Sequence, residues 1–212
     1  RVNGVAAITI REDDELLGAQ LTNGESQIIL AVKSGKLVRF EETKTRPMGR
    51  TASGVRGITL KDETDEVIGM VTVNDMESEI LVVAENGYGK RSSLDEYRIT
   101  NRGGKGVKTL NITEKNGQLT KLRSVIGDED LIITTTKGMI IRLPIEQIAT
   151  SKRSTQGVRL IKLNEGQNVA TIAVVPKTEV EELEEGMEQI DSTLETIVTE
   201  PVTEEVSENT EE

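Results

Sequence analysis

Cysteine and histidine are both absent from this sequence of 212 residues. Their absence excludes disulfide bonds, zinc sites built on Cys or His, and every nucleophile arrangement that relies on either side chain. The chain also lacks a run of 18 apolar residues and has no apolar stretch at its N-terminus, so neither a membrane-spanning helix nor a signal peptide is indicated. We therefore expect no metal site and no membrane partner, and the lack of cysteine is compatible with a cytosolic location.

Aromatic residues are nearly absent as well, since the sequence has two Tyr, one Phe and no Trp, against 19 Gly. A core must then be built from aliphatic side chains, and many turns are expected. Proteins that bind single-stranded nucleic acid stack its bases on aromatic rings. The composition therefore disfavours that function.

The net charge of −11 conceals an uneven distribution. Residues 178–212 hold 14 acidic residues and no Lys or Arg, so all 26 basic residues lie in 1–177 with the other 23 acidic ones. The body is therefore about +3 and the C-terminal segment −14. We predict a domain over 1–177 and a disordered acidic tail over 178–212, which has few apolar residues. The tail either solvates the protein or competes with an anionic partner for the basic residues.

A Gly-Val pair followed three residues later by Ile or Leu occurs four times, at Gly4, Gly54, Gly106 and Gly157, with spacings of 50, 52 and 51 residues. Three short apolar runs recur in step, and each leads into a turn glycine. They are Ile28–Val32 before Gly35, Ile80–Ala84 before Gly87, and Leu131–Thr135 before Gly138. An apolar run, a glycine turn and a second strand predict a hairpin, and a run apolar on both faces predicts a strand buried between neighbours.

Further strands fit Leu16–Thr22, Val67–Val73, Leu119–Val125 and Asn168–Val175. Each unit of about 51 residues would then hold about four strands, which is typical of propeller-like blades. The fold class is therefore predicted to be all-β, with about three complete blades and a partial one. Because a closed ring needs more blades, we expect an open arc or part of a larger domain.

Basic residues keep the same period in three sets. Arg50, Arg102 and Arg153 stand four residues before a repeat glycine, Arg56, Lys108 and Arg159 stand two residues after one, and Arg39, Arg91 and Arg142 stand four residues after a turn glycine. The loops add Arg46, Arg98, Lys105 and Lys152. Charges repeated once per blade would line a continuous edge that meets the phosphates of duplex DNA without reading its sequence.

The same period also allows a structural role, because repeated arginines can form salt bridges between blades. This alternative applies most to Arg39, Arg91 and Arg142, which lie within predicted strands. The loop sets are better candidates for DNA binding, since neighbouring glycines let backbone N–H groups approach a phosphate.

Residues 100–106 read Thr-Asn-Arg-Gly-Gly-Lys-Gly. Their last five positions match the box Gln-Arg-Arg-Gly-Gly-Lys-Gly of the DNA gyrase A family, which the sequence resembles. The box-like residues are Arg102, Gly103, Gly104, Lys105 and Gly106. The segments that begin at Arg50 and Arg153 look like degenerate copies, so the resemblance covers essentially all of 1–177.

The resemblance implies a β-pinwheel, a propeller-like domain whose blades exchange strands and whose basic rim wraps duplex DNA. This wrapping would support ATP-dependent negative supercoiling by a holoenzyme that also holds the rest of the gyrase A protein and the gyrase B protein, in the bacterial cytoplasm and associated with the nucleoid. The cleaving tyrosine and the ATP and Mg sites would lie elsewhere, so this chain would hold no catalytic residue and no cofactor. Because the family's box lies in the first blade, the chain is expected to be the later blades.

Two alternatives remain, namely the matching domain of topoisomerase IV and a propeller that binds protein partners. The near-complete box favours gyrase, and loops rich in Arg rather than aromatic anchors disfavour a protein interface. An enzyme in its own right is also disfavoured. Tyr88 and Tyr97 both lie within the repeat, and residues 87–92 lack the spacing of a phosphate-binding P-loop.

Overall fold

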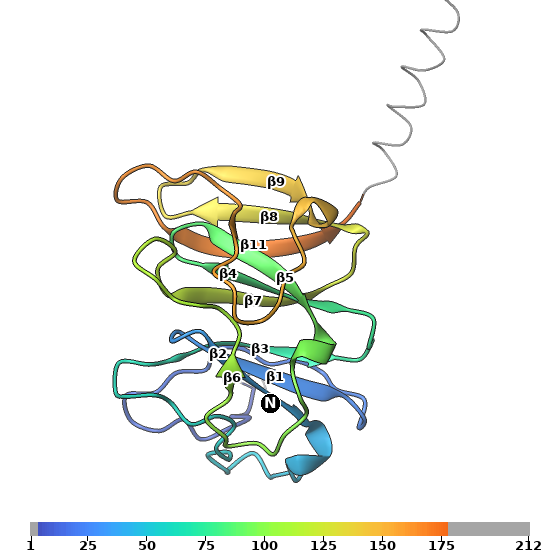
Figure 1. Ribbon diagram of the computed structural model, residues 1–212. Coiled ribbons are helices and arrows are strands. Elements are labelled where there is room, and N and C mark those ends of the chain that lie inside the picture. The colour runs from blue at the N-terminus through green and yellow to red at the C-terminus, as the bar shows by residue number, and fades with distance from the viewer. Residues whose placement is uncertain (1–3, 178–212) are drawn as a thin grey trace, which may run out of the picture. The chain divides into compact units, whose positions relative to one another are not determined.

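Three β-hairpins of one design recur along the chain, as the repeat predicted (Figure 1). The computed structural model describes residues 4–177. The hairpin strands are β1 (Gln27–Val32) with β2 (Lys36–Glu41), β4 (Glu79–Ala84) with β5 (Tyr88–Ser93), and β8 (Glu129–Thr135) with β9 (Ile140–Pro144). The turn glycines Gly35, Gly87 and Gly138 have φ values of 77°, 78° and 81°, which glycine adopts without the steric cost of a Cβ.

A short 3-10 turn follows each hairpin. These turns are η1 (Glu42–Lys44), η2 (Leu94–Glu96) and η3 (Ile145–Gln147). In each turn the residue after its last position donates its backbone N–H to the carbonyl of the first, so the chain leaves the hairpin in the same direction every time.

Each hairpin gains a third strand from the chain that follows it. The added strands are β3 (Val67–Val73), β7 (Leu119–Val125) and β11 (Val169–Pro176), and each pairs antiparallel with the first strand of the preceding hairpin. The predicted ranges for β3 and β7 agree with these bounds, and that for β11 differs by one residue at each end.

Two of the three sheets take a fourth strand from the following repeat. The short strand β6 (Val107–Lys108) pairs with β2, and β10 (Val158–Arg159) pairs with β5. We call the sheet β3-β1-β2-β6 blade A, the sheet β10-β5-β4-β7 blade B, and the sheet β11-β8-β9 blade C. Blades A and B therefore exchange strands with later repeats, as the resemblance implied, whereas blade C has three strands among the described residues.

Two apolar cores lie between neighbouring blades. In β4 the side chains of Ile80 and Val82 join a buried cluster with residues of blade A, and those of Leu81 and Val83 join a second cluster with residues of blade C. All four side chains are fully buried. The strand apolar on both faces is therefore the middle layer between two cores, as its sequence predicted.

The prediction of a strand at Leu16–Thr22 was wrong. This segment corresponds in the repeat to β3, β7 and β11, each of which pairs with the first strand of a hairpin, whereas no described strand pairs with this segment. Without a partner strand its apolar residues stay exposed, and Leu21 is 95% exposed. The Gln20 side chain nevertheless reaches β3, where its Oε1 accepts from Thr72 N–H at 2.8 Å and its Nε2 donates to the Met70 carbonyl at 3.0 Å.

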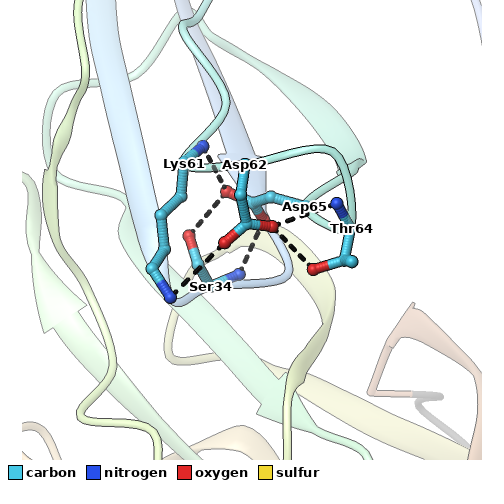
Figure 2. Close-up of polar contacts among 5 residues, drawn as sticks. All are labelled: Ser34, Lys61, Asp62, Thr64 and Asp65. Carbon is cyan, nitrogen blue, oxygen red and sulfur yellow. Dashed lines mark hydrogen bonds and ion pairs between the residues drawn. The ribbon is translucent and has the colours of Figure 1, made fainter.

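A buried polar side chain fastens the loop before β3 to the turn of the first hairpin (Figure 2). The Asp65 carboxylate accepts from the N–H and the hydroxyl of Ser34, at 2.9 and 2.8 Å, and from the N–H of Lys61 at 3.0 Å. Burial alone would raise the pKa of Asp65, but these hydrogen bonds outweigh it and hold that pKa below its usual value. Asn116 and Gln167 occupy the equivalent positions and close their own loops in the same way.

Within the part of the chain that the structure describes, no helix has the length and apolarity needed to span a bilayer. The predicted disordered tail over 178–212 lies outside the described residues.

Candidate nucleic-acid interface

The box-like loop enters blade A at a point where only glycine fits. Gly106 has φ of 70°, and a Cβ added to it would collide with the carbonyl oxygen of Leu37. Gly157 has φ of 78° in blade B, and its added Cβ would lie 2.6 Å from the carbonyl oxygen of Gly89. The repeat glycine therefore allows the fourth strand to approach the backbone of the hairpin.

One backbone hydrogen bond recurs three times and connects the glycine-containing loops of successive repeats. Thr9 N–H donates to the Ala52 carbonyl at 3.1 Å, Thr59 N–H to the Gly104 carbonyl at 2.8 Å, and Asn111 N–H to the Thr155 carbonyl at 3.0 Å. We call residues 4–9, 50–59, 102–111 and 153–159 the linked loops. Because each of these loops is bonded to the next, their side chains follow one another along the unit.

Seven of the ten predicted DNA-binding residues lie on the linked loops, and five of these seven are exposed. The exposed members are Arg50, Arg56, Lys105, Lys108 and Arg159. Among residues 4–177, none of these five takes part in an ion pair. Lys108 Nζ donates to the Asn111 side-chain oxygen at 3.3 Å, a neutral contact that leaves its charge uncompensated.

Two arginines of the linked loops are half-buried and connect neighbouring loops. Arg102 Nε donates to the Lys44 carbonyl at 3.0 Å and its Nη1 to the Arg56 carbonyl at 3.1 Å. In the next repeat Arg153 Nη1 donates to the Lys108 carbonyl at 3.3 Å. These guanidinium groups thus position the loops while adding their charge to them.

The box-like loop borders a hollow of about 480 Å³. Four cationic residues line it, namely Arg39, Arg98, Arg102 and Lys105, together with Gly103, Gly104 and Gly106. Gly103 N–H donates to the Gly57 carbonyl at 2.5 Å, which fastens the box-like loop to its neighbour. The structure therefore brings the box-like residues together in one cationic concavity.

Arg39, Arg91 and Arg142 have a different environment. Arg39 is 4% exposed, and its Nη1 donates to the carbonyls of Leu94 and Tyr97, at 2.6 and 3.0 Å, while its Nε donates to Gln27 at 2.6 Å. Burial lowers the pKa of this guanidinium, and the nearby Asp95 opposes that shift. Arg39 therefore joins blade A to the 3-10 turn η2 of the next repeat.

Arg91 repeats this joint in blade B, whereas Arg142 is exposed and pairs within its own hairpin. Arg91 forms an ion pair with Glu79 at 2.7 Å and donates from Nε to the Ile148 carbonyl beside η3 at 2.8 Å. Arg142 forms an ion pair with Asp130 at 2.6 Å. In all three cases the polar partner lies 12 residues upstream, on the first strand of the same hairpin. The structural alternative raised for this set thus fits Arg39 and Arg91 best, because Arg142 is exposed. The DNA-binding role of the three residues stays a prediction.

Lys90 is a basic residue that the repeat pattern did not single out. Its side chain is fully buried in blade B, and its Nζ donates to the Lys152 carbonyl at 2.5 Å. Burial lowers its pKa to about 8, the charge of Glu96 opposes the shift, and Arg153 adds to it. The buried Lys90 side chain therefore binds the loop of the next repeat. Its neighbours in the sequence, Gly89 and Arg91, did not indicate this role.

The two tyrosines lie in different surroundings. Tyr97 is 1% exposed and its hydroxyl shares a hydrogen bond of 2.7 Å with Thr109, while burial raises the pKa of its phenol. Tyr88 opens β5, and the Nζ of Lys115 lies 5.4 Å from the centre of its ring. Among residues 4–177 no cluster of carboxylates suited to a metal ion occurs.

Comparison with known families decides the origin of this repeat. The model of the DNA gyrase C-terminal domain, a beta-propeller, matches residues 3–23, 27–74, 78–126 and 129–176. The chain belongs to this family. The last three matched segments each span one three-stranded part of blades A, B and C, and the first contains Leu16–Thr22, which forms no strand.

Among curated proteins, this gyrase-family chain is 50% identical over 184 residues to the DNA gyrase A protein of Staphylococcus aureus strain MRSA252, an alignment that covers 86% of the chain and 21% of that protein. It is 50% identical over 174 residues to the DNA gyrase A protein of Staphylococcus epidermidis strain ATCC 12228, with coverage of 82% and 19%. The chain thus spans about a fifth of the length of these relatives.

Solved structures share the fold at lower identity. The crystal structure of the C-terminal domain of DNA topoisomerase IV superposes with a TM-score of 0.76 at 23% identity, covering 86% of this chain and 57% of that one. A DNA gyrase A C-terminal domain superposes with a TM-score of 0.75 at 21% identity, covering 82% and 59%. The β-pinwheel architecture of this gyrase-family chain is therefore common to both kinds of topoisomerase.

Proposed function

We propose that this chain binds duplex DNA along its linked loops, without reading base sequence, and bends the duplex over successive blades. The observation that supports this most directly is the threefold hydrogen bond between the loops, at Thr9, Thr59 and Asn111. Because these bonds place the loops in succession, the exposed basic side chains form a series with one step per blade. The proposed contacts are made by Arg50, Arg56, Arg102, Lys105, Lys108, Arg153 and Arg159.

The chemistry of these side chains fits phosphate rather than bases. Arginine and lysine on glycine-containing loops offer charge and N–H donors to an anion. Each phosphate neutralised in this way releases condensed counterions from the duplex, which is the main source of affinity in sequence-independent binding. A series of such contacts on consecutive blades favours a bent duplex over a straight one.

In the gyrase holoenzyme, this binding would wrap DNA and support ATP-dependent negative supercoiling. The 50% identity to staphylococcal DNA gyrase A proteins supports this role over the one in topoisomerase IV. The proposed partners are duplex DNA, the remainder of the gyrase A protein and the gyrase B protein, in the bacterial cytoplasm and at the nucleoid. Strand cleavage and ATP hydrolysis, with its Mg, would take place outside this chain.

Fluorescence anisotropy of a labelled duplex of mixed sequence, titrated with the full chain at several salt concentrations, tests the binding. If the seven basic residues each meet a phosphate, log K should fall against log[salt] with a slope of about −6. A slope near zero would contradict the proposal and favour a propeller that binds proteins.

A second experiment separates the two topoisomerase roles. The gyrase A protein carrying this chain is reconstituted with the gyrase B protein and ATP, and supercoiling of relaxed plasmid is compared with decatenation of linked circles. Supercoiling in preference to decatenation is expected. Efficient decatenation without supercoiling would instead indicate the topoisomerase IV role.

A further inference from the structure

Two lysines occupy opposed positions on neighbouring strands of blade A, and no carboxylate among the described residues pairs with either of them. In the register of β2 and β6, Lys36 lies directly opposite Lys108. Like charges in directly opposed strand positions destabilise a sheet. No ion pair of the described residues 4–177 involves either lysine. Such a pair indicates a place where an external anion compensates the charge.

Blade B reaches the same arrangement by a different route. The residue equivalent to Lys36 is Tyr88, which lies directly opposite Arg159 in β10. The second cation comes from Lys115, whose Nζ lies over the Tyr88 ring at 5.4 Å from its centre. A lysine over an aromatic face is held by cation–π attraction and keeps its charge. Both blades therefore carry two cations beside the first residue of the second hairpin strand.

The loop around Lys115 is fastened to the hairpin turn of blade B. The Lys115 carbonyl accepts from the Asn86 side chain at 3.3 Å, and Asn116 closes the loop by accepting from Thr113 N–H at 2.8 Å. The Lys115 side chain thus starts from a fixed backbone. The arrangement borders a hollow of about 400 Å³, which Lys162 also lines and where Glu165 is the one carboxylate among the lining residues.

From these observations we propose a second series of phosphate contacts, formed by Lys36 with Lys108 in blade A and by Lys115, Arg159 and Lys162 in blade B. The proposal rests on the proposed function, because it assigns further contacts on the same duplex. It extends the interface from the linked loops toward the turns of the hairpins. Blade C has Met139 at the position of Lys36 and Tyr88, and no fourth strand among the described residues, so it contributes no such pair.

Neutralising Lys115 in the full chain tests the assignment. Lys115→Gln should reduce the steepness of the salt dependence for duplex binding by about 0.9 and weaken binding ~8-fold at about 0.1 M salt, as expected for one lost phosphate contact. The matched control is Lys121→Gln, which removes one charge from β7, at the opposite edge of the same sheet. The control should leave the slope unchanged.

A double variant tests the assignment by restoring the salt dependence that Lys115→Gln should reduce. Adding Tyr88→Lys to Lys115→Gln places a lysine opposite Arg159, as Lys36 stands opposite Lys108, and should restore the slope. Melting curves by circular dichroism verify that all variants fold.

Three outcomes would overturn the proposal. Equal losses in Lys115→Gln and Lys121→Gln would mean that net charge alone is responsible. A normal slope in Lys115→Gln, beside a reduced slope in Lys105→Gln, would overturn this second series and leave the proposed function intact. No salt-dependent binding by the unaltered chain would overturn both.

Discussion

The basic residues of the hairpins and those of the linked loops share one period but not one environment. Arg39 is 4% exposed and makes its hydrogen bonds inside the protein, whereas Arg56, 17 residues further along, is exposed and joins no ion pair of the described residues. Both recur once per blade. The period establishes that members of a set occupy equivalent places, and the neighbours of each place decide whether its charge faces protein or solvent.

The difference follows from the local backbone. Arg39 and Arg91 lie in strands covered by the next repeat, so each guanidinium must find acceptors there, and carbonyls next to η2 and η3 supply them. Arg56 and Lys105 lie in loops whose backbone groups bond the adjacent loop, which leaves the side chains outside. One set joins the blades, and the other is available to an anionic partner.

Replacing Arg39 should have the largest effect on stability. Arg39→Met leaves the carbonyls of Leu94 and Tyr97 and the Gln27 side chain without their donor, which should lower the free energy of unfolding by about 3 kcal/mol. Urea denaturation measures the loss, with Arg56→Met as control and expected to change by less than about 0.5 kcal/mol. Similar losses in the two variants would remove the distinction between the sets.

Lys90 sharpens the comparison through pH. Its folded-state pKa of about 8 lies below the ordinary 10.5, so between these values the unfolded chain binds more protons than the folded one, and stability should rise with pH. The rise should be about 2 to 3 kcal/mol between pH 8 and 10.5, relative to Lys90→Met, in which it is absent. Thermal or urea unfolding of both proteins across this range measures the difference. If the stability of the two proteins changed equally with pH, the folded-state pKa of Lys90 would not be lowered.

A loop lysine should show the opposite behaviour to Arg39. Lys105→Gln should weaken duplex binding ~8-fold at about 0.1 M salt, with the salt dependence less steep by about 0.9, because one phosphate contact is lost. Its free energy of unfolding should stay within about 0.5 kcal/mol of the unaltered chain. Anisotropy and urea denaturation on the same samples report both, and a stability loss without a binding loss would assign Lys105 to the joints.

The smallest effect is expected from removing the acidic tail. The chain 1–177 has a net charge of +3 instead of −11, so it should repel the duplex less and bind severalfold more tightly at low salt. The gain should disappear at high salt, where charges are screened. Titration of the duplex with both chains tests this, and equal affinities at low salt would mean that the tail only solvates the protein.

The sequence contained the repeat, the hairpins and most of the strands, because apolar runs and turn glycines act locally. It misplaced Leu16–Thr22, because a strand requires a partner and the pattern does not reveal whether that partner is present. Period alone also could not separate Arg39 from Arg56. A usable signal did exist, since Gln27, Glu79 and Asp130 stand 12 residues before the three hairpin arginines. The repeat did not reveal Lys36 and Lys115, because blades A and B supply the second cation from different positions of the repeat.

The fourth strand that blade A takes from the following repeat has a consequence for synthesis on the ribosome. Blade A has its first three strands once Val73 has emerged, but β6 ends at Lys108, 35 residues later. At a synthesis rate of about 5–20 residues per second, the edge of β2 stays unpaired for roughly 2–7 seconds. During that interval it offers free backbone groups to any strand nearby. Blades A and B are therefore completed only when the following repeat has been synthesised, and until then one edge of each sheet stays open.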